Sequence, residues 1–88
     1  MEKNDQPYLL AQTAMAQLKA AVHQVLSHGP AEGLKNSDIG RLLGIYMGHV
    51  EHQGHIPRTL LAIMESEGVV EQDKDTKSWR IRSYPQGG

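Results

Sequence analysis

Residues 57–82 read PRTLLAIMESEGVVEQDKDTKSWRIR, and this stretch decides the fold. In its first half, Leu60, Leu61, Ile63 and Met64 recur at helical spacing between a proline and a glycine, which predicts a helix that opens at Pro57 and closes at the glycine of position 68. The proline suits a first helical turn and the glycine suits a helix end. We therefore expect a helix of about twelve residues here.

The second half of the stretch changes from a helical period to the period of a strand. Trp79 and Ile81 alternate with two arginines, a pattern typical of a half-buried strand, and the polar run 73–77 separates them from the valines at 69 and 70. This arrangement predicts a β-hairpin. We expect Val69, Trp79 and Ile81 to face the core.

Two more helices precede this stretch. Apolar residues recur at steps of three and four over residues 8–28, which predicts one long helix. A short helix follows, with Asn36 as its N-cap and Gly44 at its end, and its buried face is expected to consist of Ile39, Leu42 and Leu43. Residues 45–55 contain two glycines and three histidines without a clean period, so we expect a loop that is helical in part at most.

Composition limits the classes of protein that fit. The chain has 88 residues, a net charge of −1 and no cysteine, so it is expected to form one domain without disulfides or thiolate metal sites. No apolar run approaches the roughly 20 residues of a membrane span, and no signal peptide is recognisable, so we expect a cytoplasmic protein. The sequence shows no glycine-rich phosphate-binding loop after a strand and no pair of carboxylates in an apolar setting. It also shows no nucleophile that the fold would bring near a His and an Asp. We expect no enzyme, no cofactor and no small-molecule substrate.

The order of elements favours one fold. Three helices followed by a two-stranded hairpin, mainly α with a small β part, is the layout of a winged helix-turn-helix domain, here residues 1–83 with a disordered tail at 84–88. Residues 33–39 (GLKNSDI), 43–45 (LGI) and 60–70 (LLAIMESEGVV) resemble winged helix-turn-helix DNA-binding domains of bacterial regulators and of some phospholipase D-like restriction endonucleases. The resemblance covers about residues 33–72, and it departs from the family in the long segment 45–55. It implies binding to duplex DNA without catalysis.

Such a domain reads base edges with the first half of its third helix and contacts phosphates with its second helix and hairpin. Arg58 is the strongest single candidate for a base contact. The full set of expected DNA-binding residues is Lys35, Arg41, Gln53, His55, Arg58, Thr59, Lys74, Lys77, Arg80 and Arg82.

The distribution of charge supports this assignment only modestly. Residues 69–88 carry four basic and three acidic side chains, and residues 1–68 carry five basic and seven acidic ones, which gives net charges of +1 and −2. The alternative is that Arg80 and Arg82 form the solvated face of an edge strand and that residues 73–77 form a turn of mixed charge.

Three histidines at positions 49, 52 and 55 have the spacing of one helix face, and neutral imidazole is a common ligand of zinc and nickel. The glycines at 48 and 54 oppose a rigid helix there. We therefore expect no metal site, and interpret the histidines as donors to phosphate or as residues facing water.

The first helix is about 30 Å long at roughly 1.5 Å per residue, longer than the core that three helices and a hairpin can offer it. Its overhang is expected to carry a homodimer interface formed by Leu9, Leu10, Ala14 and Met15. The alternatives are that the helix lies on its own hairpin or frays in water.

Two functions remain open at this point. The first is a non-catalytic DNA-binding protein, a small transcriptional regulator that binds duplex DNA as a dimer. The second is a winged-helix module for protein–protein contact in a larger assembly, which the near-neutral charge allows. Salt dependence of binding separates them, because phosphate contacts weaken with ionic strength and an apolar interface does not.

Overall fold

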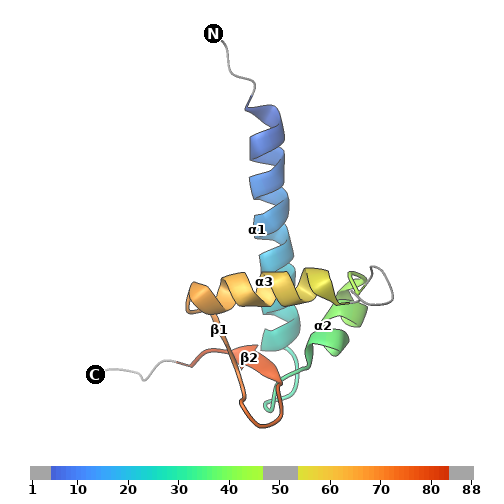
Figure 1. Cartoon of the computed structure of the whole chain (residues 1–88), viewed down its shortest axis with the longest axis vertical. Helices are drawn as coiled ribbons and strands as arrows, with labels where there is room; N and C mark the ends of the chain where they lie inside the picture. The colour runs from blue at the N-terminus through green and yellow to red at the C-terminus, as the bar shows by residue number, and fades with distance from the viewer. Residues whose placement is uncertain (1–4, 47–53, 84–88) are drawn as a thin grey trace, which may run out of the picture.

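Three helices and a two-stranded antiparallel hairpin make up the chain in a computed structural model that describes residues 5–46 and 54–83. The elements are α1 (Gln6–Ser27), α2 (Asn36–Leu43), α3 (His55–Ser66), β1 (Val70–Gln72) and β2 (Trp79–Ile81). In Figure 1, α3 lies across α1, α2 lies beside one end of α3, and the N-terminal half of α1 projects away from the other elements. The expected class, mainly α with a small hairpin, is confirmed. The expected tail 84–88 lies outside the described residues.

One hydrophobic core joins all five elements. Its eight buried side chains are Val22, Leu26, Ile39, Leu60, Leu61, Met64, Val70 and Trp79. Burying an apolar side chain of this size contributes about 1.5–3 kcal/mol to the free energy of folding. Val70 and Trp79 of the hairpin therefore contribute to stability on the same scale as the helix side chains. The hairpin therefore closes the side of the core that the helices leave open.

The hairpin register decides which of its residues face the core. Val70 pairs with Ile81 and Glu71 with Arg80, so that Val70 is 1% exposed while Val69 is only half-buried. Val69 packs against the core, as expected, but Val70, which the expectation did not name, is the valine that is fully buried. Trp79 and Ile81 do face inward, as expected.

A third short backbone segment pairs with the hairpin. The N–H of Leu34 donates to the carbonyl of Trp79 at 2.9 Å, and the N–H of Trp79 donates to the carbonyl of Leu34 at 2.7 Å. Gly33, just before this bridge, has φ +92°, and a Cβ there would meet the Trp79 carbonyl oxygen at 2.4 Å. The close approach requires glycine at this position. The bridge thus joins the segment between α1 and α2 directly to the hairpin.

The second helix differs from expectation at its start and on one face. Lys35, not Asn36, is the N-cap residue, and its backbone N–H donates to the Asp38 carboxylate at 3.3 Å. The Asn36 side chain instead donates to the carbonyl of Gly54 at 3.1 Å, which connects the start of α2 to the start of α3. Leu42, expected to be buried, is 65% exposed. With Ile39 buried, the apolar face of this helix is narrower than the sequence suggested.

The third helix begins at His55, two residues before the proline that was expected to open it. Pro57 is buried in the first turn, where its missing N–H leaves no hydrogen bond unmade. His55 therefore belongs to the helix rather than to the preceding segment. The helix ends at Ser66, close to the predicted end.

The first helix is longer than the core it packs against, as predicted. Only Val22 and Leu26 among its 22 residues are buried. Near its N-terminus, Tyr8, Leu9 and Leu10 are 65%, 57% and 67% exposed. From Met15 onward α1 packs against the rest of the chain, whereas its first turns project away from it (Figure 1).

Candidate nucleic-acid interface

The exposed face of α3 is polar in its first half. His55, Arg58 and Thr59 are all exposed, while Pro57 and Leu60 on the other face are buried. The first acidic side chain of the helix, at position 65, lies near its C-terminal end. Three of the four side chains expected to read base edges therefore share the outer surface of one helix.

The fourth expected base contact, Gln53, lies outside the described residues, as do His49 and His52. His55 lies on the exposed surface at the start of α3. Within residues 5–46 and 54–83, no group of three His, Cys, Asp or Glu side chains is arranged to hold a metal ion.

Two basic side chains of the α2 region are exposed. Lys35 precedes the helix, and Arg41 lies in its last turn. The Arg41 guanidinium lies 4.6 Å from the centre of the Tyr46 ring, a distance at which a cation and an aromatic ring attract each other. This contact restricts the orientations of the Arg41 side chain and leaves its N–H donors available at the surface.

Arg80, a member of the expected basic face of the hairpin, is paired with two carboxylates. Arg80 donates from Nε to the Glu71 carboxylate at 3.0 Å and lies 3.8 Å from the Asp73 carboxylate. Its charge is therefore balanced within the hairpin, which matches the alternative of a solvated strand face. Lys74, Lys77 and Arg82 are exposed.

The hairpin turn is organised by one carboxylate. The backbone N–H groups of Thr76 and Asp75 both donate to Asp73 Oδ1 at 2.8 Å, and these hydrogen bonds, aided by the nearby Arg80, lower the pKa of Asp73 below its ordinary value. Lys77 completes the turn with φ +69°, a left-handed conformation that side-chain-bearing residues adopt at a cost. The turn thus holds Lys74 and Lys77 at the tip of the hairpin in a defined backbone.

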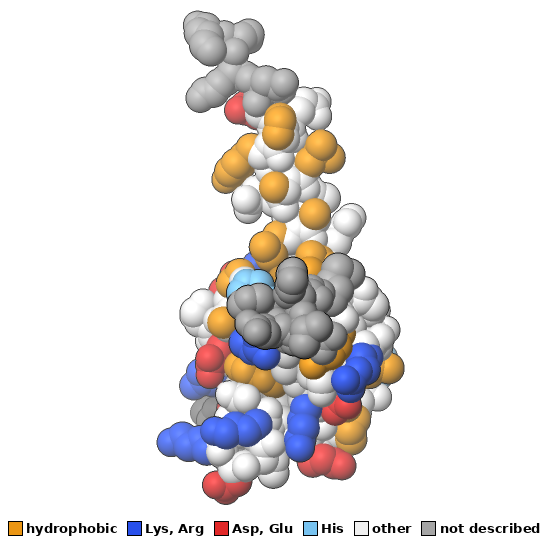
Figure 2. Space-filling view, turned by 45° about the vertical axis from the view of Figure 1, so that its right-hand side comes forward, with side chains coloured by type: hydrophobic (Ala, Val, Ile, Leu, Met, Phe, Trp, Pro, Cys, Tyr) orange, Lys and Arg blue, Asp and Glu red, His pale blue; other side chains and the backbone are white. Residues whose placement is uncertain are grey.

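Figure 2 shows Lys and Arg side chains gathered over the globular part of the molecule, with Asp and Glu side chains among them. The projecting part of α1 carries hydrophobic and uncharged polar side chains instead. Between Gln6 and Leu18 the sequence contains no Lys, Arg, Asp or Glu. The surface of α1 between Asp5 and Lys19 is therefore uncharged, in contrast to the globular part of the molecule.

Three of the four residues expected at a dimer interface, Leu9, Leu10 and Ala14, are exposed on the projecting part of α1. Met15 differs, because it is half-buried and packs against the core cluster. Lys19 anchors the helix just below, through an ion pair of 2.9 Å with Glu67 after α3. The uncovered apolar surface is therefore confined to the first turns of the helix.

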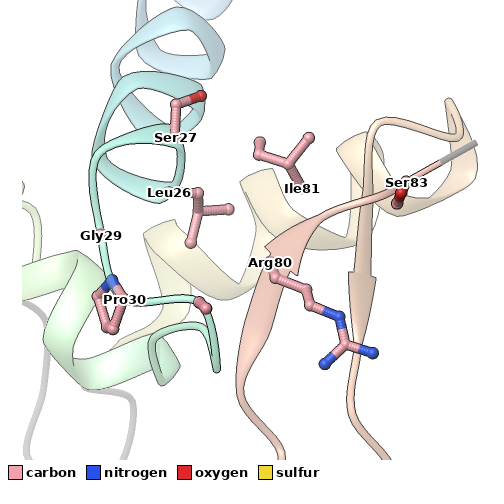
Figure 3. Close-up of a pocket in the computed structure, with 8 residues that line it drawn as sticks. Leu26, Ser27, Gly29, Pro30, Arg80, Ile81 and Ser83 are labelled. Carbon is pink, nitrogen blue, oxygen red and sulfur yellow. The ribbon is translucent and has the colours of Figure 1, made fainter.

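A hollow of about 460 Å³ lies between the end of α1 and β2. Figure 3 shows Leu26 and Ile81 on its apolar side, and the Arg80 side chain extending away from Leu26 toward the neighbouring strand. Arg80 is the one ionisable side chain in its lining, and that guanidinium is already paired with Glu71 and Asp73. The lining of this hollow offers no pair of groups suited to acid–base or nucleophilic chemistry.

Comparison of the chain with protein-family models, with curated proteins and with solved structures finds no match. None of the helices in the described part of the chain has the length and apolar character required to cross a membrane. Sequence reasoning missed two contributors to the surface described above. Tyr46 contacts Arg41 across the end of α2, and no periodic pattern announces that contact. Leu34 joins the hairpin through a bridge to Trp79, a contact too distant along the chain for a local pattern to predict.

Proposed function

We propose that the chain is a winged helix-turn-helix domain that binds duplex DNA without catalysis, with α3 as its recognition helix and the hairpin as its wing. The observation that carries the proposal is the exposed polar face of α3, where His55, Arg58 and Thr59 lie together on the first half of the helix. A helix inserted in the major groove contacts base edges with its N-terminal half. The fold supports this, because the α2–α3 pair is followed directly by a hairpin.

In this proposal Arg58 makes the main base contact. An arginine can donate two hydrogen bonds to the O6 and N7 atoms of guanine, and such a pair discriminates by about 1–3 kcal/mol against the wrong base. His55 and Thr59 flank it on the same exposed face. The acidic end of α3 then lies away from the base-reading half of the helix.

Phosphate contacts are assigned to Lys35, Arg41, Lys74, Lys77 and Arg82. All five are exposed, and they lie on α2 and the hairpin, the two elements that flank α3 in sequence. Stacking on Tyr46 lowers the conformational entropy that Arg41 would lose on binding. We remove Arg80 from the contact set, because its ion pairs with Glu71 and Asp73 keep the two strands in register.

A dimer is the proposed binding unit, with the projecting part of α1 as its interface. The support is the exposure of Leu9 and Leu10 on a segment with no charged side chain. Two-fold pairing would also double the number of phosphate contacts available to a domain of this small net charge. A dimeric DNA-binding domain of this kind suits a small transcriptional regulator.

A second function, a winged-helix module for protein–protein contact, is favoured by a separate observation. Leu42 is 65% exposed on α2, next to a shallow hollow lined by Leu34, Asp38 and Arg41. An apolar side chain so exposed beside a recess is the kind of feature that protein partners cover. This function predicts binding that survives high salt.

Titration of a fluorescent random-sequence 30-bp duplex at two salt concentrations separates the two functions. We expect affinity to fall by about 3- to 4-fold per phosphate contact between 50 and 200 mM salt, which for the five assigned contacts is a loss of roughly several hundredfold. Arg58→Lys serves as the matched variant, since it keeps the charge and should leave this nonspecific binding unchanged. Absence of binding at 50 mM salt would reject the DNA-binding function.

A further inference from the structure

We infer that Tyr46 is a positioning residue of the DNA-reading surface: its ring seats the start of α3 against α2, and thereby sets where Arg58 lies relative to Arg41. The inference rests on the proposed DNA-binding function for its effect on recognition. The seating of α3 is argued from contacts within the chain, and it can be tested without DNA.

One edge of the Tyr46 ring lies between two glycine backbones. A Cβ added at Gly40, in α2, would lie 2.9 Å from both Cβ and Cδ1 of Tyr46. A Cβ added at Gly54, the residue before α3, would lie 2.7 Å from Cε1 of the same ring. Both glycines are buried. The ring therefore fits closely between α2 and the start of α3, and a side chain at either glycine would displace it.

The first turn of α3 meets α2 at the same place. The Cβ added at Gly40 would also lie 3.0 Å from Cγ of the buried Pro57. In Figure 1, α2 lies beside the end of α3 at which that helix begins. The start of α3 is thus in contact with α2 directly at Pro57 and indirectly through the Tyr46 ring.

The turn that ends α2 fixes the position of this ring. The N–H of Ile45 donates to the carbonyl of Gly40 at 2.8 Å, and the N–H of Gly44 donates to the carbonyl of Arg41 at 3.2 Å. Such hydrogen bonds close the C-terminal end of a helix and turn the chain back toward it. Tyr46 is the next residue, so the end of α2 itself holds the ring beside Gly40.

The carbonyl oxygen of Gly54 joins the two helices through hydrogen bonds. It accepts from Asn36 Nδ2, at the first residue of α2, and from the backbone N–H of Arg58, both at 3.1 Å. The second of these has the i to i−4 pattern of an α-helix and belongs to the first turn of α3. The glycine that touches the Tyr46 ring is therefore also the acceptor that fixes the backbone of Arg58.

The Tyr46 ring also orients a proposed phosphate contact. The guanidinium of Arg41 lies over the ring, 4.6 Å from its centre. One ring thus sets the position of the Arg41 side chain and, through Gly54, of the Arg58 backbone. Phosphate contacts fix the register of a protein on a duplex, and base contacts then discriminate among sequences. Loss of the ring should therefore reduce discrimination more than it reduces overall affinity.

Tyr46 can be replaced without opening the hydrophobic core. It is half-buried, and among the described residues neither the core cluster nor the side chains packed against it include Tyr46. Tyr46→Leu removes the ring and keeps an apolar side chain. Tyr46→Phe is the matched control, since it keeps the ring between the glycines and beneath the guanidinium. Circular dichroism establishes that each variant is folded.

Hydrogen exchange measured by NMR tests the seating of α3 in the free protein. We expect the Arg58 amide to exchange about tenfold faster in Tyr46→Leu than in the wild type, because its acceptor is held less firmly, while amides in the second half of α3 are unchanged. Tyr46→Phe should exchange like the wild type. An unchanged Arg58 amide in Tyr46→Leu, or equal acceleration along the whole of α3, would overturn the inference.

Titration with two duplexes, one selected by the wild-type protein and one of random sequence, tests the effect on recognition. We expect Tyr46→Leu to lose about tenfold in affinity for the selected duplex and less than about threefold for the random one. Tyr46→Phe should restore the wild-type ratio between the two duplexes. Equal losses on both duplexes would overturn the positioning role, because a purely structural defect lowers the two affinities alike.

Gly40→Ala keeps the test decisive if Tyr46→Leu does not fold. The new Cβ displaces the ring without removing it, so the same acceleration at Arg58 and the same loss of discrimination are expected, and the absence of both would overturn the inference. The two proposals also fail differently. If the wild type binds neither duplex but the Arg58 amide still depends on Tyr46, DNA binding is rejected and the seating of α3 is supported.

Discussion

Replacing Gly33 by alanine should destabilise the domain by about 2–5 kcal/mol. Gly33 has φ +92°, and the left-handed region costs a residue with a side chain roughly 1–2 kcal/mol. The added Cβ would also lie 2.4 Å from the Trp79 carbonyl oxygen, which belongs to backbone and cannot move without disturbing the Leu34–Trp79 bridge. Each of the two hydrogen bonds of that bridge contributes about 0.5–1.5 kcal/mol.

Gly44→Ala is the matched control for this prediction. Gly44 has a similar φ of +73°, but a Cβ there would meet no atom within 4 Å. Replacing Gly44 by alanine should therefore lower the free energy of unfolding only by the cost of the left-handed backbone conformation, about 1–2 kcal/mol. Urea unfolding of both variants, followed by Trp79 fluorescence, measures the two free energies. Equal costs for the two substitutions would refute the tight approach of residue 33 to the hairpin.

The remaining predictions concern the hairpin. Trp79→Ala should cost about 3–5 kcal/mol and unfold so small a domain at room temperature, as circular dichroism would reveal, while Trp79→Phe should retain the fold. Lys77→Gly should raise the stability by about 1 kcal/mol in urea, because Lys77 adopts φ +69°, whereas Lys77→Ala should leave it unchanged. The depressed pKa of Asp73 means that the carboxylate stabilises the hairpin above about pH 4, and that this stability is lost as the pH falls through the lowered pKa. Asp73→Asn keeps the oxygen that accepts the turn hydrogen bonds, so thermal melts from pH 2 to 7 should show a weaker acid dependence; an unchanged acid dependence would contradict this role.

The helices and the hairpin could be predicted because each has a strong local period. The steps of three and four in α1 and the alternation around Trp79 are properties of the sequence itself. Helix ends were less accurate, since Lys35 rather than Asn36 is the N-cap of α2 and Asn36 is its first helical residue. The Asn36 side chain bonds to Gly54, eighteen positions away, and no local pattern announces that contact.

The errors on the core and the surface share one physical cause, the dependence on contacts distant in sequence. Val69 and Val70 are chemically identical and both contact the core, so only the pairing of Val70 with Ile81 decides which one is fully buried. The local pattern around Arg80 does not reveal its ion pair, because that pair depends on the cross-strand position of Glu71. Exposure of Leu42 likewise depends on how α2 packs.

Binding of duplex DNA by the outer face of α3 is the central claim, and titration of a selected duplex with wild-type protein, Arg58→Ala and Lys74→Ala tests it most directly. We predict that Arg58→Ala loses about 1–3 kcal/mol on the selected site and discriminates less among its variants. Lys74→Ala should weaken binding to selected and random duplexes equally and reduce the salt slope by about one. If both variants remain folded and bind the selected duplex as tightly as the wild type, the claim is contradicted.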